Sequence, residues 1–341
     1  MTAPPPVLPE TYPAKPYKAD GGFETPGLIM LATSMVVAGG VLGYLAHLIN
    51  PHLWLVLLFP MILGAALGAV AKYTIKKGRV RSPLIAGVVA FVGAAFMLAL
   101  MHHFDYERFL RQLRAEVPQW QELRAMTPAE RLEAYPPPQP RIGNVVAYSD
   151  QLKYNELLHG FREIDVDSFG KYLSLKADDG IRLKSTRGSS DSSGAPITGI
   201  GVYIYWIVEI LIAATIAFFM GRSQAKMPYS RRSGVWKMPQ LLGSLDPAQK
   251  SDVVAALKNG NLARLQAAGP TAAIGPLMLT AFVSPTETEE DVDLKLESAN
   301  PQGKLGQEAM VTLPAAALGE LQAMFTPVPS VSDNASSAHP A

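Results

Sequence analysis

The sequence predicts a mainly α-helical membrane protein: a four-helix transmembrane bundle with a small extracytoplasmic α+β module and a small cytoplasmic α+β module. Two observations carry this prediction. Lys and Arg gather beside the apolar parts of the chain, as they do at the cytoplasmic ends of membrane helices. Four apolar blocks also approach the ~20 residues that a helix needs to cross a ~30 Å hydrocarbon core; they occupy residues 28–49, 53–71, 84–101 and 200–220.

Composition excludes several classes of function. The chain has 341 residues and no Cys, which excludes disulfides, thiolate metal sites, covalent c-type haem attachment and Cys nucleophiles. Its net charge is +1, and no basic stripe with interleaved aromatic residues is present, so we expect no nucleic-acid partner. The mean hydropathy of +0.14 hides a separation, because the charges lie in the tails and loops between the apolar blocks.

The first three blocks contain no Asp, Glu, Lys or Arg, and the fourth contains only Glu209. A cleaved signal peptide is excluded for the first block, which is too long and follows a polar tail. Lys and Arg cluster after the second and fourth blocks, so the positive-inside rule places both termini in the cytoplasm. These basic residues are Lys72, Lys76, Lys77, Arg79 and Arg81, and then Arg222, Lys226, Arg231, Arg232 and Lys237.

Small residues four positions apart predict close contacts among the first three spans, because they let helix backbones approach in lipid. Ala86, Ala90 and Ala94 follow this spacing in the third span. The candidate helix-packing glycines are Gly39 and Gly43 in the first span and Gly64 and Gly68 in the second.

The rest of the chain falls into four segments. We expect a disordered, Pro-rich cytoplasmic tail at 1–27, an extracytoplasmic module at 104–199, a cytoplasmic module at 221–326 and a disordered tail at 327–341. In the extracytoplasmic module, Thr127 and Glu130 form the pattern of a capping box. Further helices are expected at 155–161 and 167–176, and a short strand at 180–186.

The cytoplasmic module has the pattern of a mixed α+β fold. Asp246 and Gly260 are typical of the first and last residues of a helix, and a shorter helix is expected at 261–269. Three segments have strand-like composition, and the first two form a hairpin around an acidic loop. These strands are expected at 276–284, 291–298 and 309–313, followed by a helix at 314–325.

Glu209 is the main candidate functional residue. At 1.5 Å per residue it lies ~14 Å below the membrane surface, where a bare carboxylate is costly, so it is protonated or paired. One interpretation is a carboxylate that carries protons or coordinates ions. The other is a protonated Glu209 that donates a hydrogen bond to a neighbouring helix and fixes packing or assembly.

Four histidines map to the outer ends of the first three spans: His47, His52, His102 and His103. Such a cluster suggests a metal or b-type haem site. Against this, His102 and His103 are adjacent and point about 100° apart on a helix. The Asp165 segment resembles the start of a calcium loop but has Lys176 where a Glu is required. We therefore expect no metal or other cofactor, and no enzyme motif is present.

The segment at 180–236 resembles the last span of uncharacterised bacterial four-span inner-membrane proteins, on the motif Y-I-Y-W-x-x-E at 203–209. Glu209 matches the acid of that motif. Some of these proteins carry Cys pairs soon after the span, which this chain lacks. The resemblance implies a bacterial inner-membrane protein and implies no activity.

These observations favour a structural, accessory or regulatory membrane component that binds a protein partner or forms a homo-oligomer in the lipid bilayer. The alternative is an oligomeric transporter or proton-coupled subunit that uses Glu209. A third hypothesis, a membrane enzyme with chemistry at the outer histidines, lacks a recognisable nucleophile–base pair.

Overall fold

The computed structural model describes residues 11–49, 58–116, 120–138, 148–181, 197–271, 275–286, 290–300 and 302–325. The chain divides into two units, a helical unit at Phe23–Gln224 and a sheet unit made of Met1–Gly22 and Ala225–Ala341. The helical unit is built on four helices that are long and apolar enough to cross a membrane. They are α1 (Thr25–Ile49), α2 (Leu58–Gly78), α3 (Pro83–Glu116) and α8 (Ile200–Ala225).

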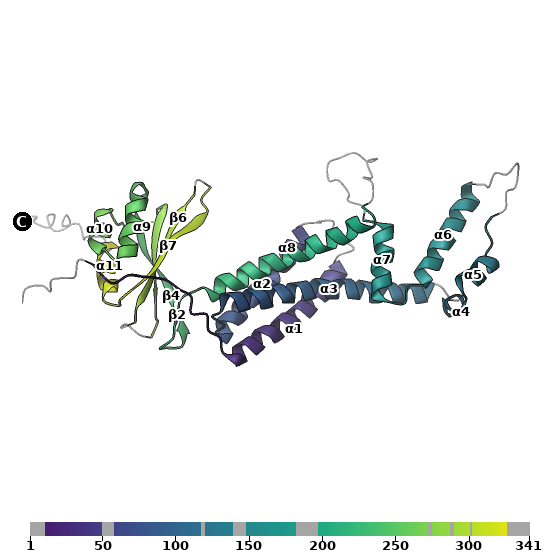
Figure 1. Cartoon of the computed structure of the whole chain (residues 1–341), viewed down its shortest axis with the longest axis horizontal. Coiled ribbons are helices and arrows are strands. Elements are labelled where there is room, and N and C mark those ends of the chain that lie inside the picture. The colour runs from purple at the N-terminus through teal and green to yellow at the C-terminus, as the bar shows by residue number, and fades with distance from the viewer. Residues whose placement is uncertain are drawn as a thin grey trace, which may run out of the picture. The chain divides into compact units, whose positions relative to one another are not determined.

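The four helices lie side by side (Figure 1). Their bounds agree with the four expected spans, with three differences. The helix α8 extends to Ala225, beyond the expected end at residue 220. The helix α2 continues to Gly78, so it includes Lys72, Lys76 and Lys77, which the sequence analysis placed after the span. The helix α3 runs well beyond the expected end at residue 101. Residues 50–57, which contain the start of the second expected span, lie outside the described part of the chain.

Four shorter helices follow α3 in the helical unit. They are α4 (Trp120–Ala125), α5 (Pro128–Ala134), α6 (Tyr148–Ile164) and α7 (Phe169–Asp179). The expected capping box is confirmed, because the Glu130 amide donates to the Thr127 hydroxyl and the Thr127 amide donates to the Glu130 carboxylate. Of the expected strand at 180–186, only Gly180 and Ile181 are described, and Ile181 forms a bridge with Ile197.

Two small apolar clusters hold α4, α6 and α7 to the end of α3. Leu113 packs with Leu123, Phe161 and Ile164. The second cluster consists of Tyr106, Val166, Tyr172 and Leu175. Burial raises the pKa of the Tyr172 phenol, and the negative charge of Asp105 raises it further.

The sheet unit is an antiparallel sheet in the order β1-β7-β6-β5-β4, with the helices α9, α10 and α11 packed on it (Figure 1). The strands are β1 (Lys15–Pro16), β4 (Met238–Leu245), β5 (Leu277–Val283), β6 (Val292–Ala299) and β7 (Leu305–Leu313). A separate hairpin joins β2 (Tyr229–Ser230) to β3 (Val235–Trp236). The helices are α9 (Lys250–Asn259), α10 (Leu262–Ala267) and α11 (Ala317–Phe325), and a 3₁₀ turn, η2 (Pro247–Gln249), precedes α9.

The three strands and three helices that the sequence predicts in this module are all present, whereas β1 and β4 were not predicted. The strand β4 is interrupted by a bulge between Leu241 and Gly243. A side chain on Gly243 would place its Cβ 2.1 Å from the Thr271 carbonyl oxygen, so this close approach requires glycine. Pro239 is tolerated because β4 lies at the edge of the sheet.

The expectation of a disordered tail at 1–27 does not hold for the described residues of that segment. The strand β1 pairs with β7, and Tyr12 is buried in the core between the sheet and its helices. The Tyr17 amide donates to the Met310 carbonyl at 3.1 Å. Thr25 and its neighbours already belong to α1. The Pro-rich composition predicts disorder only when no partner strand is available, and β7 provides one.

Candidate functional site

The helix α8 places the phenol of Tyr205 directly beside the carboxyl group of Glu209. The two residues are four positions apart and so lie on the same face of the helix. The Tyr205 hydroxyl donates a hydrogen bond to Oε1 of Glu209, and both side chains are half-buried. The sequence analysis expected a bond from Glu209 to a neighbouring helix; the bond that the structure shows lies within α8.

The stretch of α8 around this pair, residues 203–211, is sparsely covered and contains no buried residue. Ile204 and Ile207 are both 56% exposed, and Leu211 is 48% exposed. The following turns are packed on one face, where Ala213, Ala214 and Ala217 are fully buried. Glu209 therefore lies where the protein's own contacts on α8 become few.

The candidate packing glycines all lie against other helices. A Cβ on Gly39 would be 3.3 Å from the Gly93 carbonyl oxygen, and one on Gly43 would be 2.6 Å from the Met97 carbonyl oxygen, both in α3. Gly64 and Gly68 instead face α8, at Ala213 and Met220. The small residues Ala86, Ala90 and Ala94 of α3 are fully buried.

A second polar pair joins α1 to α3. The Nδ1 atom of His47 lies 2.5 Å from Oδ1 of Asp105, and His47 is only 3% exposed. Aromatic rings surround the imidazole: its centroid is 6.3 Å from that of Tyr44 and 6.1 Å from that of Phe104. This pair lies at the C-terminal end of α1, where it closes the contact between α1 and α3.

The other histidines have different neighbours. The ring centroid of His102 lies 5.5 Å from that of Trp206 in α8, whereas His103 packs on Phe169 at 5.8 Å. His52 lies outside the described residues. In the described ranges, no group of three or more His, Cys, Asp or Glu side chains is placed to hold a metal ion.

No protein-family model, curated protein or solved structure matches this chain. The chemistry of the site is therefore argued from its geometry. The apolar helices offer one carboxyl group paired within its own helix and one buried His–Asp pair, both suited to holding helices together or to exchanging a proton.

Sequence reasoning identified Glu209 and His47 but missed their partners. Tyr205 was not paired with Glu209 in the sequence analysis, although its spacing of four residues from Glu209 was a usable signal. Asp105 carried no such signal. Its contact with His47 depends on how α1 and α3 are rotated against each other, and the glycines of α1 determine that rotation.

Proposed function

We propose that this chain is a multi-pass protein of the cell inner membrane with both termini in the cytoplasm. In this proposal it works as a structural, accessory or regulatory component that binds a helix of a partner protein or of a second copy. The observation that carries the proposal is the Tyr205–Glu209 pair on the sparsely covered stretch of α8 at residues 203–211. The proposal also takes α1, α2, α3 and α8 as a transmembrane bundle, which their length, apolar composition and glycine contacts support.

The cost of a polar group in lipid is the physical reason. An ionised carboxylate near the centre of a membrane helix costs ~2.5–3.5 kcal/mol, so Glu209 is more stable as a neutral acid. A neutral carboxyl group that accepts a hydrogen bond from Tyr205 still has a proton to donate. A helix that covers this face and accepts that proton would gain about 0.6–2 kcal/mol from the bond, in addition to packing on Ile204 and Ile207.

Basic residues support the orientation. The end of α2 and the segment after α8 carry the two Lys and Arg clusters, and both clusters lie on one side if all four helices cross the membrane. That side then holds the sheet unit, while α4 to α7 lie on the other side. The sheet unit offers a cytoplasmic surface for a soluble partner of the same assembly.

Affinity purification in mild detergent, followed by mass spectrometry, tests the proposal. We expect Glu209→Gln to retain the partner or the oligomer, because the amide keeps a donor and an acceptor, and Glu209→Leu to lose it. The matched control is Thr215→Leu, which removes a polar side chain from an exposed position of the same helix. Retention of the complex by Glu209→Leu would contradict the proposal.

The same variants separate assembly from transport. A transporter or proton-coupled subunit that uses Glu209 would assemble normally as Glu209→Gln but lose proton or ion flux in reconstituted vesicles, because an amide does not titrate. If Glu209→Gln abolishes flux while every variant assembles equally, the transport function replaces the one proposed here.

A further inference from the structure

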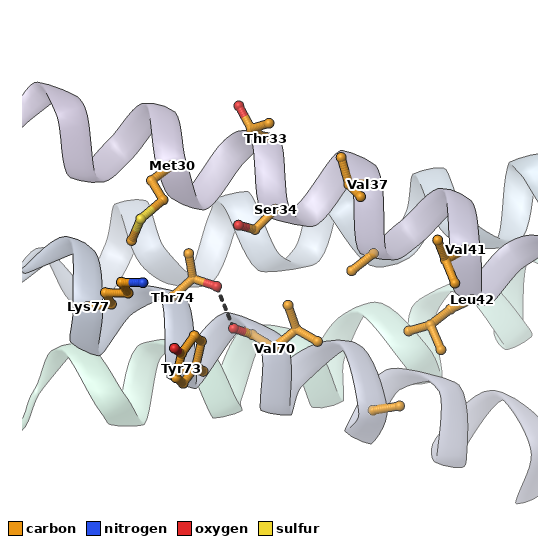
Figure 2. A pocket seen from close by; sticks show the side chains of 12 residues that line it. Met30, Thr33, Ser34, Val37, Val41, Leu42, Val70, Tyr73, Thr74 and Lys77 are labelled. Carbon is orange, nitrogen blue, oxygen red and sulfur yellow. Dashed lines mark hydrogen bonds between the residues drawn. The ribbon is translucent and has the colours of Figure 1, made fainter.

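An open groove lies between α1 and α2. Its volume is about 710 Å³, within the ~300–1,000 Å³ range of ligand sites. Figure 2 shows Val37 and Val41 of α1 on one side of the groove and Val70 of α2 on the other. The groove is independent of Glu209, which belongs to α8.

Glycine contacts explain why the groove exists. At one end α1 and α2 touch, since a Cβ on Gly27 would lie 1.7 Å from the Gly78 carbonyl oxygen. Further along, Gly39 and Gly43 hold α1 against α3. The helix α2 is held against α8 by Gly64. Beyond the Gly27–Gly78 contact, α1 therefore packs on α3 and α2 packs on α8. The space between α1 and α2 is left unfilled.

The polar groups of the groove are gathered at one end. Lys77, Thr33 and Ser34 line the part nearest the Gly27–Gly78 contact, and Figure 2 shows Lys77 on the same stretch of α2 as Tyr73 and Thr74. The Thr74 hydroxyl donates to the Val70 carbonyl at 2.6 Å, so it is already satisfied. The remainder of the groove is lined by aliphatic side chains, among them Val41 and Leu42. The groove therefore has a positive charge and hydroxyl groups at one end and is apolar at the other.

The length of the groove matches one leaflet of a bilayer. From Met30 to Leu42 the helix α1 rises about 18 Å at 1.5 Å per residue. Half of a ~30 Å hydrocarbon core is about 15 Å. The polar end thus reaches the membrane interface when the apolar end reaches the middle of the membrane.

We propose that this groove binds one anionic glycerophospholipid. Its phosphate contacts the Lys77 ammonium and the nearby hydroxyl groups, and one acyl chain lies along Val37, Val41 and Val70. Basic pockets between membrane helices on the cytoplasmic side are a known mode of binding anionic head groups. Lys76 adds positive charge at the same end of α2.

A second helix is a poorer occupant than a lipid. Helices in membranes approach closely at small residues, whereas the α1 side of the groove presents Val37 and Val41, which are 60% and 56% exposed. A helix laid along the groove would also cover Lys77, and it would have to supply an acid at that depth. A phospholipid supplies the negative charge and the apolar chain in one molecule.

Native mass spectrometry of the delipidated full-length protein tests this proposal. The probes are phosphatidylglycerol and phosphatidylcholine with identical acyl chains. We expect a 1:1 adduct with phosphatidylglycerol that is about tenfold tighter than the one with phosphatidylcholine. Both lipids present a phosphate to Lys77, but the choline cation offsets that charge, so only phosphatidylglycerol has a net negative head group. Lys77→Gln should remove this preference. The matched control Lys72→Gln, an exposed lysine of α2 that does not line the groove, should change the affinity by less than about twofold.

A second pair of variants tests the apolar part. Ala66 lines the groove and Ala69 of the same helix is exposed outside it, so Ala66→Phe should reduce binding of both lipids and Ala69→Phe should not. Thermal unfolding of both variants shows whether Ala66→Phe still folds. Equal affinity for the two lipids in the wild type, or an unchanged adduct in both Lys77→Gln and Ala66→Phe, would overturn the proposal. A dimer that Ala66→Phe dissociates, without any lipid adduct, would assign the groove to a second copy instead.

Discussion

Tyr12 donates its phenolic hydrogen to the carboxylate of Glu320 in α11, although 308 positions separate the two residues. The Tyr12 backbone amide also donates to the Gly260 carbonyl at 2.8 Å, at the end of α9. The Tyr12 side chain is only 7% exposed. The segment that precedes α1 is thus part of the core of the sheet unit, and the chain enters and leaves the helical unit from the same folded module.

Removing Tyr12 should destabilise the sheet unit. We expect Tyr12→Ala to cost about 3–5 kcal/mol, because it deletes a buried aromatic side chain, and Tyr12→Phe to cost about 0.5–1.5 kcal/mol, because it removes one hydrogen bond. Hydrogen exchange of β7 and α9 in the full-length protein measures this. The matched control is Lys18→Ala, an exposed residue of the same segment. Unchanged exchange in Tyr12→Ala would show that this segment does not contribute to the core.

The same contact should make the sheet unit sensitive to alkaline pH. The hydrogen bond to Glu320 raises the pKa of Tyr12 from its ordinary 10.0 to about 12, with burial and the Glu320 charge adding to the effect. A raised pKa in the folded state means that this stabilisation is complete below pH 10.0 and is lost as the pH rises through about 12. The free energy of unfolding of the full-length protein, measured with denaturant between these pH values, should fall more steeply with pH in the wild type than in Tyr12→Phe. Parallel curves for the two proteins would contradict the assignment.

Much of this architecture follows from local sequence signals. The apolar helices, the Thr127–Glu130 capping box and the helix that ends at Gly260 are each specified within a few residues. By contrast, β1 is ordered by an edge of β7 that lies almost 300 positions away. No local pattern in a Pro-rich segment reports such a partner, so composition predicted disorder instead.

The candidate site likewise has features that local sequence predicts and features that depend on contacts between helices. Glu209 stands out because a single acid in an apolar block is visible without any structure. The His47–Asp105 contact and the α1–α2 groove depend on which helix each glycine faces. The spacing of Gly39 and Gly43 predicts a helix contact but does not identify α3 as the partner helix. The groove exists because α1 packs on α3 along these glycines rather than on α2.

The glycine contact between α2 and α8 should be sensitive to a single methyl group. A Cβ on Gly64 would lie 2.5 Å from the Ala213 carbonyl oxygen, so Gly64→Ala forces the two helices apart. We expect a loss of about 1–3 kcal/mol, measured by thermal unfolding in detergent. Gly40→Ala is the matched control, because no heavy atom lies within 4 Å of its added Cβ. Equal unfolding temperatures for the two variants would argue against the contact.

The His47–Asp105 pair should stabilise the packing of α1 on α3. Because His47 is buried, Asp105→Ala leaves its imidazole without the carboxylate, at an expected cost of about 1.5–3 kcal/mol. Asp105→Asn, which keeps an acceptor, should recover part of the loss. Thermal unfolding in detergent at neutral pH provides the measurement, with His103→Gln as a control that leaves the pair intact. The pair is not stabilising if Asp105→Ala unfolds at the wild-type temperature.

The orientation of the chain can be tested with single cysteines, because the natural sequence contains none. Lys153 in α6 and Lys258 in α9 are both exposed, so a cysteine at either position is accessible to a maleimide once its side of the membrane is reached. With both termini in the cytoplasm, a membrane-impermeant maleimide should label Lys153→Cys in intact spheroplasts and label Lys258→Cys only after the membrane is opened. The reverse pattern would invert the topology, which would also move the Lys77 end of the groove to the outer leaflet. Labelling of both positions in intact spheroplasts would mean that α8, which lies between them, does not cross the membrane.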